Sequence, residues 1–217
     1  MQLSIGLAMQ NLGGVEPTTL QLILCLFIPE SGLFKNWTQI HDIDGLKFFE
    51  YPRKLEKNIS ALYYSSLAGI QELSASLLQK GENANAEGGR LGNPLQAASC
   101  KGHETIVKLL LENGAKLSAK GGRYGNALQA ASYRGNEAIV KLLLESGAEA
   151  NAEGGQYGNA LQAASYRGNE AIVKLLLENG AEVNAEGGQY GNALQAASCE
   201  GHGAIVKLLL ENGAVQR

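Results

Sequence analysis

The side chains that could bind a metal ion are few and widely separated. Cys25, Cys100 and Cys199 lie far apart in the sequence, and no two of them have the close spacing of metal ligands. His103 and His202 each follow a glycine, with no second histidine nearby. An odd number of cysteines without tight spacing is also not typical of a disulfide framework. We therefore predict neither a metal site nor a disulfide.

The other groups that could do chemistry are four serines and one acidic segment. Each serine follows two alanines, and no general base is placed beside it, so we expect packing between helices instead of nucleophilic attack. These serines are Ser99, Ser132, Ser165 and Ser198. The segment from Asp42 to Gly45 begins like a calcium loop but lacks the later ligands and the terminal glutamate, which favours a turn. The sequence predicts no catalytic residue, no cofactor and no enzyme activity.

Composition and charge exclude several classes of protein. Hydrophobic residues make up 45% of the chain and charged residues 18%, which is enough apolar side chain for a core. The net charge of -3 and the absence of an evident basic patch argue against a nucleic-acid partner. The longest apolar run, Leu20 to Ile28, is far shorter than the roughly 20 residues that cross a bilayer. The first basic residue is Lys35, so we predict no signal peptide, no membrane span and an intracellular, cytoplasmic location.

A repeat of 33 residues supplies the elements that would position any functional side chain. The dipeptide Gly-Asn recurs at 92–93, 125–126, 158–159 and 191–192. The stretches 124–156 and 157–189 are identical except at two positions. The same register extends upstream in degraded form, because Gly69 lies 33 residues before Gly102. This predicts a fifth, atypical repeat before the four regular ones.

Each repeat has the pattern of two short helices and an irregular segment. Asn126 can cap a helix over 127–134, Gly135 can end it, and a second helix is predicted over 136–145. The second helix is apolar on most of its surface, so one repeat must stack on its neighbours. The glycine-rich segment 152–158 suits a protruding, hairpin-like finger. Ion pairs four residues apart are expected on the second helices, namely Glu104/Lys108, Glu137/Lys141 and Glu170/Lys174.

The repeated motif resembles the ankyrin repeat. It reads Asn-Ala-Leu-Gln-Ala-Ala-Ser, then a glycine, then Ile-Val-Lys-Leu-Leu-Leu-Glu, and the resemblance covers about residues 60–214. It implies an all-α ankyrin-repeat solenoid of helix-turn-helix units with glycine-rich fingers. Asparagine and glutamine replace the family's usual threonine and histidine, so the hydrogen bonds of the first turn must be made differently. The family commonly has a structural histidine where His103 and His202 stand.

We expect three parts along the chain. Residues 1–14 are expected to be irregular, and 15–58 to form a helical N-terminal cap, with helices over 16–28 and 31–41, followed by a connecting loop. Residues 59–217 are expected to form five ankyrin repeats, bounded at about 59–88, 89–121, 122–154, 155–187 and 188–217. The last repeat keeps the apolar residues of the inner ones, so we expect an exposed face around Ile205, Leu208 and Leu209. Such a face would belong to a fragment of a longer array or would stack end to end on another copy.

A second resemblance concerns fungal proteins. The motif Gly-Asn-Ala-Leu-Gln is similar to that of ankyrin arrays that follow a NACHT-type ATPase domain in fungi, and the segment from Asn36 to Asp42 resembles the flank before such arrays. No phosphate-binding loop of the form Gly-x-x-x-x-Gly-Lys-Ser/Thr occurs in this chain. The leading hypothesis is a non-enzymatic scaffold for protein–protein interaction. The alternatives are the sensing arm of a NACHT-type signalling ATPase and a self-assembling solenoid.

The resemblance also implies where a protein partner would bind. Ankyrin proteins bind on a concave surface, through finger tips and the ends of the first helices, and the matching positions here are those at which the repeats differ. They are Arg90, Cys100, Lys101, Arg123, Tyr133, Arg134, Gln156, Tyr166, Arg167, Gln189, Cys199 and Glu200. Tyrosine and arginine are common energetic anchors of interfaces. Tyr124, Tyr157 and Tyr190 recur without variation and are expected to pack finger to finger instead.

Overall fold

The computed structural model describes residues 60–215, and in this range the chain forms ten short helices in five consecutive pairs. The pairs are α4 (Ala61–Ala68) with α5 (Gln71–Gln79), α6 (Pro94–Lys101) with α7 (Glu104–Glu112), α8 (Ala127–Arg134) with α9 (Glu137–Glu145), α10 (Ala160–Arg167) with α11 (Glu170–Glu178), and α12 (Ala193–Cys199) with α13 (Gly203–Glu211). The prediction of an all-α solenoid is confirmed. The predicted N-terminal cap and the irregular segment 1–14 lie outside the described residues.

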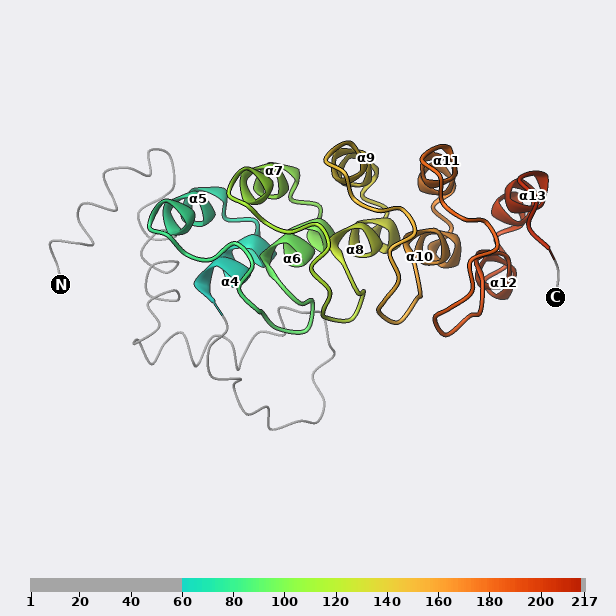
Figure 1. Cartoon of the computed structure of the whole chain (residues 1–217), viewed down its shortest axis with the longest axis horizontal. Helices are drawn as coiled ribbons and strands as arrows, with labels where there is room; N and C mark the ends of the chain where they lie inside the picture. Colours follow the sequence, from blue (N-terminus) through green and yellow to red (C-terminus); the bar gives the residue numbers. More distant parts are fainter. Residues whose placement is uncertain (1–59, 216–217) are drawn as a thin grey trace, which may run out of the picture. The chain divides into compact units, whose positions relative to one another are not determined.

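The helices of the array lie in two rows. Figure 1 shows α4, α6, α8, α10 and α12 in one row and α5, α7, α9, α11 and α13 in the other, and we call these the first and second helices. The loops before α6, α8, α10 and α12 project away from the row of second helices. Each of the last three loops is closed by an antiparallel bridge between two glycines, Gly121 with Gly125, Gly154 with Gly158 and Gly187 with Gly191. These loops are the predicted hairpin-like fingers.

A reciprocal pair of asparagine and glutamine starts the first helices α6, α8 and α10. In α8 the side chain of Asn126 accepts from the backbone N–H of Gln129, and the side chain of Gln129 accepts from the N–H of Asn126. The amide of Gln129 also donates to the carbonyls of Ala152 and Gly158 in the next finger, both at 2.9 Å. One glutamine therefore caps its own helix and binds the following repeat. These are the different first-turn hydrogen bonds that the sequence required.

The turn between paired helices is also bound to its neighbour. The predicted second helix over 136–145 begins one residue later, because Asn136 adopts a non-helical conformation before Glu137. The side-chain amide of Asn136 donates to the carbonyl of Ser99 in the preceding repeat, at 2.7 Å. His202 makes the equivalent contact, with Nε2 3.1 Å from the carbonyl of Tyr166. His103 likewise lies against the preceding repeat, so both histidines are structural, as the resemblance implied.

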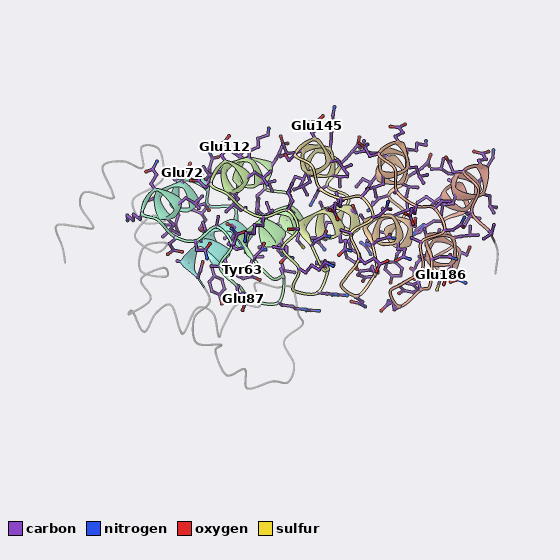
Figure 2. The ribbon with its side chains drawn as sticks, in the orientation of Figure 1. Tyr63, Glu72, Glu87, Glu112, Glu145 and Glu186 are labelled. Carbon is purple, nitrogen blue, oxygen red and sulfur yellow. The ribbon has the colours of Figure 1, made fainter. Side chains whose placement is uncertain are left out.

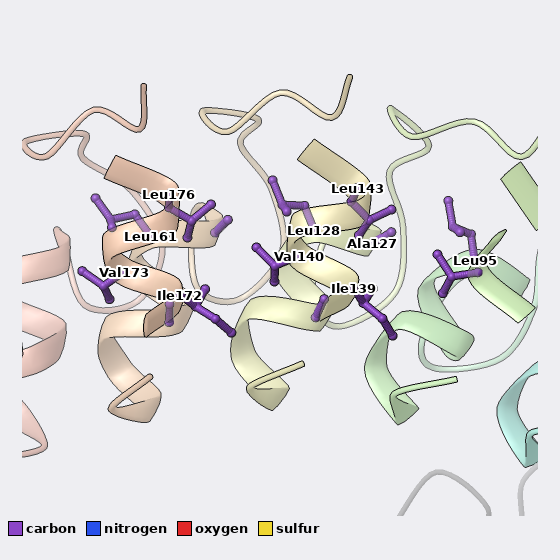
Figure 3. Packing of buried hydrophobic residues seen from close by; sticks show 14 of the residues in the cluster. Leu95, Ala127, Leu128, Ile139, Val140, Leu143, Leu161, Ile172, Val173 and Leu176 are labelled. Carbon is purple, nitrogen blue, oxygen red and sulfur yellow. The ribbon is translucent and has the colours of Figure 1, made fainter. Parts of the chain in front are cut away.

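The hydrophobic core runs through the array between the two rows of helices. Figure 3 shows Leu128, Ile139 and Leu143 of one repeat in the same arrangement as their equivalents in the next, and all three are buried. Ala130 and Ala131 are 0% exposed, and their small side chains let α8 pack against both α6 and α10. Burial of this kind contributes on the order of 25 cal/mol per Å² of apolar surface. The contacts between repeats therefore hold the array together.

Two sequence predictions about side chains need correction. Ser99, Ser132 and Ser165 are buried between helices as expected, but Ser198 is exposed, since of the first helices only α10 packs against α12. Lys141 pairs with Glu145 at 3.9 Å and not with Glu137, because an exposed lysine can reach a glutamate one turn away on either side at nearly equal energy. The pairs Glu104/Lys108 and Glu170/Lys174 do form.

The prediction that Ile205, Leu208 and Leu209 form an exposed apolar face on the last repeat is also wrong. Ile205 and Leu209 are 1% and 0% exposed, because they point into the core shared with α11, and Leu208 is partly buried against it. The exposed large hydrophobic side chains of residues 60–215 are Leu210 and Val215, at 42% and 46%. The helical period turns the predicted residues inward and Leu210 outward.

Asparagine side chains at equivalent positions hydrogen-bond one repeat to the next, but position 118 lacks an asparagine. Asn151 donates to the carbonyl of Gly180 at 2.9 Å and accepts from the N–H of Glu182 at 2.8 Å, and Asn85 and Asn184 make the equivalent bonds. The equivalent residue of the remaining regular repeat is Ser118. We expect Ser118→Asn to stabilise the protein by about 1 kcal/mol, because it can bond to Gly147 and Glu149. Thermal unfolding should shift upward by roughly 2–4 °C, whereas an unchanged midpoint, equal to that of Ser118→Ala, would contradict the prediction.

Candidate functional site

Five tyrosines form one continuous aromatic stack across three fingers and two first helices. The finger tyrosines stack in parallel, with 6.3 Å between the ring centroids of Tyr124 and Tyr157 and between those of Tyr157 and Tyr190. Tyr133 of α8 lies beside two of them, 4.9 Å from Tyr124 and 4.6 Å from Tyr157. Tyr166 of α10 lies in the same way beside Tyr157 and Tyr190. The rings thus link the repeats through side chains as well as through the helix core.

The stack joins two sets of tyrosines for which the sequence predicted different roles, one in binding and one in packing. Tyr124 and Tyr157 are 6% and 3% exposed and pack finger to finger, as predicted. Tyr133 and Tyr166, predicted to contact a partner, are half-buried and stack on each other at 6.2 Å. Their rings have a structural role in addition to the edges that they leave exposed. Only the three-dimensional arrangement could reveal this, because the two sets are nine residues apart in the chain.

The environment of the stack keeps its hydroxyl groups protonated. Burial raises the pKa of Tyr124 to about 12. The pKa of Tyr157 is raised still further, first by burial and then by hydrogen bonding with Tyr133. The pKa of Tyr166 is raised to about 12, chiefly by a hydrogen bond with Tyr190. Ionising one of these hydroxyls would bury a charge or break the hydrogen bond that the hydroxyl donates.

The raised pKa values predict an alkaline limit to stability. An unfolded tyrosine ionises near pH ~10, while Tyr124 in the folded chain holds its proton to about 12. The stabilisation from the stack is therefore fully present below pH ~10 and is lost as the pH rises through the folded pKa. We expect the free energy of unfolding to fall across this window, with late tyrosinate absorbance in the native protein. If all the tyrosines ionise near pH ~10 while the protein stays folded, the stack does not exist in solution.

Arginines border the stack, and one of them is engaged by the fingers. Arg123 donates from Nε to Oε1 of Gln156 at 2.9 Å, and Gln156 donates in turn to Gln189 at 2.7 Å. The Arg123 guanidinium also lies 5.7 Å from the ring centroid of Tyr124. Arg167 lies 5.0 Å from the ring of Tyr133, a cation–π arrangement across one repeat. Arg123 and Gln156 are therefore partly used in holding neighbouring fingers in register.

The remaining predicted residues differ in how much surface they offer. Arg134, Arg167, Gln189, Cys199 and Glu200 are exposed, and Arg90 and Lys101 are half-buried. Cys100 is 4% exposed, because α8 packs against the helix that carries it, so its prediction as a contact residue is wrong. Lys120, an exposed residue on a finger, was missed. Its position holds glutamate in the other repeats, so the variation between repeats could have identified it.

These residues define one surface of the array. We call it the finger surface, formed by the fingers and the C-terminal ends of the first helices. Its members are Arg90, Lys101, Lys120, Arg123, Tyr133, Arg134, Gln156, Tyr166, Arg167, Gln189, Cys199 and Glu200, together with the exposed finger glutamates Glu87, Glu153 and Glu186. Within residues 60–215, no three histidine, cysteine, aspartate or glutamate side chains gather where they could hold a metal ion. In the same range no helix is long and apolar enough to span a membrane.

Comparison with known proteins agrees with this architecture. A family model described as ankyrin repeats in three copies matches residues 127–216, and a second ankyrin-repeat model matches residues 95–144. The chain is an ankyrin-repeat protein. The matched ankyrin segments together span α7–α13 and nearly all of α6, with α4 and α5 before them. Ankyrin repeats generally mediate protein–protein interaction and are typically non-enzymatic.

One curated relative of the ankyrin chain comes from a fungus. The Azaphilone pigments biosynthesis cluster protein L of Monascus ruber is 37% identical over 99 residues. The match covers 41% of the ankyrin chain and 21% of that protein, so the chain spans about a fifth of its relative.

Proposed function

We propose that this ankyrin array is a non-enzymatic scaffold that binds a protein partner on its finger surface. The observation that carries the proposal is the continuous stack of five tyrosines, bordered by exposed arginines. Rings that are locked against one another lose little conformational entropy when a partner binds. Tyrosine and arginine are also the residues that most often carry the binding energy of interfaces.

The chemistry of the surface supports binding over catalysis. A hydrolytic or transfer site needs a nucleophile or base with an activating partner. Cys199 is exposed, but its near neighbour His202 has its ring nitrogen against the carbonyl of Tyr166. Tyr166 and Tyr124 hold their protons to a pKa of about 12, too high for a base at neutral pH. The groups on this surface are suited to hydrogen bonding and contact.

Site-specific photo-crosslinking tests the location of the partner. A photo-reactive phenylalanine analogue would replace Glu153 on a finger or Glu178 at the end of α11, two exposed glutamates of equal size on opposite sides of the array. Both proteins would be expressed in cells of the source organism and irradiated. We expect crosslinked partners from position 153 and few from position 178. Crosslinks that come equally from both positions, or only from 178, would refute the finger surface as the binding site.

Two further functions have narrower support. Self-association is favoured by Leu210 and Val215, the exposed large hydrophobics of the described range, which both lie in or just after α13. It predicts concentration-dependent sedimentation that Leu210→Glu abolishes and Leu208→Met does not. A role as the sensing arm of a NACHT-type ATPase rests on the resemblance of the repeat motif and of the segment from Asn36 to Asp42 to fungal proteins of that kind. A phosphate-loop domain encoded in the same reading frame would favour that role.

A further inference from the structure

The two rows of helices carry opposite charge. The first helices α6, α8 and α10 each contain one basic residue, Lys101, Arg134 and Arg167, and no acidic one. The second helices α7, α9 and α11 each contain two glutamates and one lysine. Figure 2 shows Glu112 and Glu145 on the side of the second helices, away from the fingers. The fingers also carry the exposed glutamates Glu87, Glu153 and Glu186, so the finger surface, with Glu200, holds six basic and four acidic residues and is slightly basic in a chain with a net charge of -3.

The basic residues of the two rows also differ in kind and in pairing. All four arginines of residues 60–215 lie on the finger surface: Arg90, Arg123, Arg134 and Arg167. The ion pairs found in this range join lysine to glutamate within the second helices. Arg134 and Arg167 thus meet no carboxylate of the described chain, and both are exposed. A guanidinium presents a fork of donors that fits a carboxylate with two parallel hydrogen bonds.

We propose that the finger surface recognises an acidic, extended segment of its protein partner, whose carboxylates pair with Arg134, Arg167 and the neighbouring basic residues. This inference rests on the proposed function and adds the chemistry of the partner to it. Complementary charge of this kind steers association and selects among partners. It is also consistent with the acidic second helices, which would repel the same segment from the opposite side of the array.

The spacing of the repeats fits an extended chain. The rings of Tyr133 and Tyr166, which immediately precede the two arginines, are 6.2 Å apart. Alternate residues of an extended strand are about 6.6–6.8 Å apart and point to the same side. Acidic residues at every second position of such a strand would be spaced about as far apart as these rings. Same-face residues of a helix are about 4.5–6 Å apart along its axis, so a peptide that alternates glutamate with glycine, which disfavours a helix, is the probe that tests the extended form.

The charge also changes along the array, which gives the surface a direction. Finger positions hold Arg90 and Arg123 in the earlier repeats and Gln156 and Gln189 in the later ones. At the ends of the first helices the sequence runs from basic residues to Glu200, which follows α12. Between α6 and α10 one glutamate, Glu153, stands among five basic residues of the surface, so an acidic segment is attracted there and is repelled at Glu186 and Glu200.

The tyrosine stack favours an acidic peptide over a single-stranded nucleic acid. Proteins that bind single strands stack the bases on open aromatic faces. Here Tyr133 is half-buried and already lies 4.9 Å from Tyr124, 4.6 Å from Tyr157 and 6.2 Å from Tyr166 between centroids. A ring with three aromatic neighbours leaves less of its face to a base than a free-standing aromatic side chain does. The exposed edges of the stack and the arginines suit a peptide with carboxylate side chains.

Fluorescence anisotropy on the full chain tests the inference. The probe is a fluorescein-labelled peptide of about a dozen residues, alternating glutamate with glycine, and the control peptide replaces each glutamate with glutamine. We expect only the glutamate peptide to bind, with affinity that falls as salt is raised. The double variant Arg134→Gln/Arg167→Gln should weaken binding at least about ten-fold. The matched variant Lys141→Gln/Lys174→Gln, which removes two exposed cations from second helices, should leave it unchanged.

Several outcomes would overturn the inference. They are equal binding of the two peptides, equal weakening by the second-helix variant, and tighter binding of a single-stranded oligonucleotide than of the glutamate peptide. Circular dichroism and thermal unfolding of each variant establish that the fold is intact, and both arginines are exposed, so we expect little change. Failure of the peptide to bind, with finger-specific crosslinking retained, would reject the acidic partner and keep the proposed function. Loss of finger-specific crosslinking would reject both.

Discussion

Gly155→Ala is expected to destabilise the protein by about 2–6 kcal/mol, from backbone strain of ~1–3 kcal/mol and a forced shift of similar size. Gly155 has φ of 63°, a backbone conformation that residues other than glycine rarely adopt. A Cβ at this position would lie 2.3 Å from the backbone carbon of Tyr124 in the preceding finger. Backbone atoms cannot move aside as a flexible side chain can, so the two fingers would have to separate. Urea denaturation followed by circular dichroism measures the loss.

Gly147→Ala is the matched control for this effect. Gly147 also has positive φ, 94°, but a Cβ there would meet no atom within 4 Å. We therefore expect it to show the strain of ~1–3 kcal/mol alone, and the difference between the two variants measures the contact between fingers. Equal destabilisation by both alanines would mean that the fingers are not packed as the structure has them.

Tyr157→Ala is expected to destabilise the protein by about 3–5 kcal/mol, as do other truncations of large buried aromatic residues. Tyr157 is 3% exposed and stands at the centre of the stack, in contact with the rings of Tyr124, Tyr133, Tyr166 and Tyr190. Its removal leaves a cavity between two fingers and two helices. Equilibrium unfolding gives the free energy, and near-ultraviolet circular dichroism should lose the signal of the coupled rings.

Two other substitutions separate the parts of this effect. Tyr157→Phe keeps the ring but loses the hydroxyl contacts with Arg123 and Tyr133, so a loss of only ~1 kcal/mol is expected. Tyr190→Ala removes a half-buried ring at the end of the stack, which contacts Tyr157 and Tyr166 alone, and should be milder than Tyr157→Ala. The opposite order would show that the rings act independently and do not form a stack.

Both substitutions bear on function, because the finger surface depends on contacts between fingers. Gly155 allows neighbouring finger backbones to touch, and Tyr157 fills the space beside them. A partner that binds several repeats at once needs these fingers held in a fixed relation. Variants at these two positions would therefore weaken binding by loosening the surface, whereas Arg134→Gln would weaken it with the array intact. Comparing stability and binding separates the two cases.

The sequence alone determined the repeat, the helix pairs and the fold. The 33-residue period, Asn126 as a cap and Gly135 as a helix end depend on interactions within a few residues of one another, which local propensities express directly. The second role of Gln129 and the burial of Cys100 were decided by the neighbouring repeat. So was the joining of Tyr133 with Tyr157 into one stack. The physical reason is that these features arise where residues about 20 to 40 positions apart meet, and a pattern within one repeat carries no record of which side chains the stacking of the next repeat brings together.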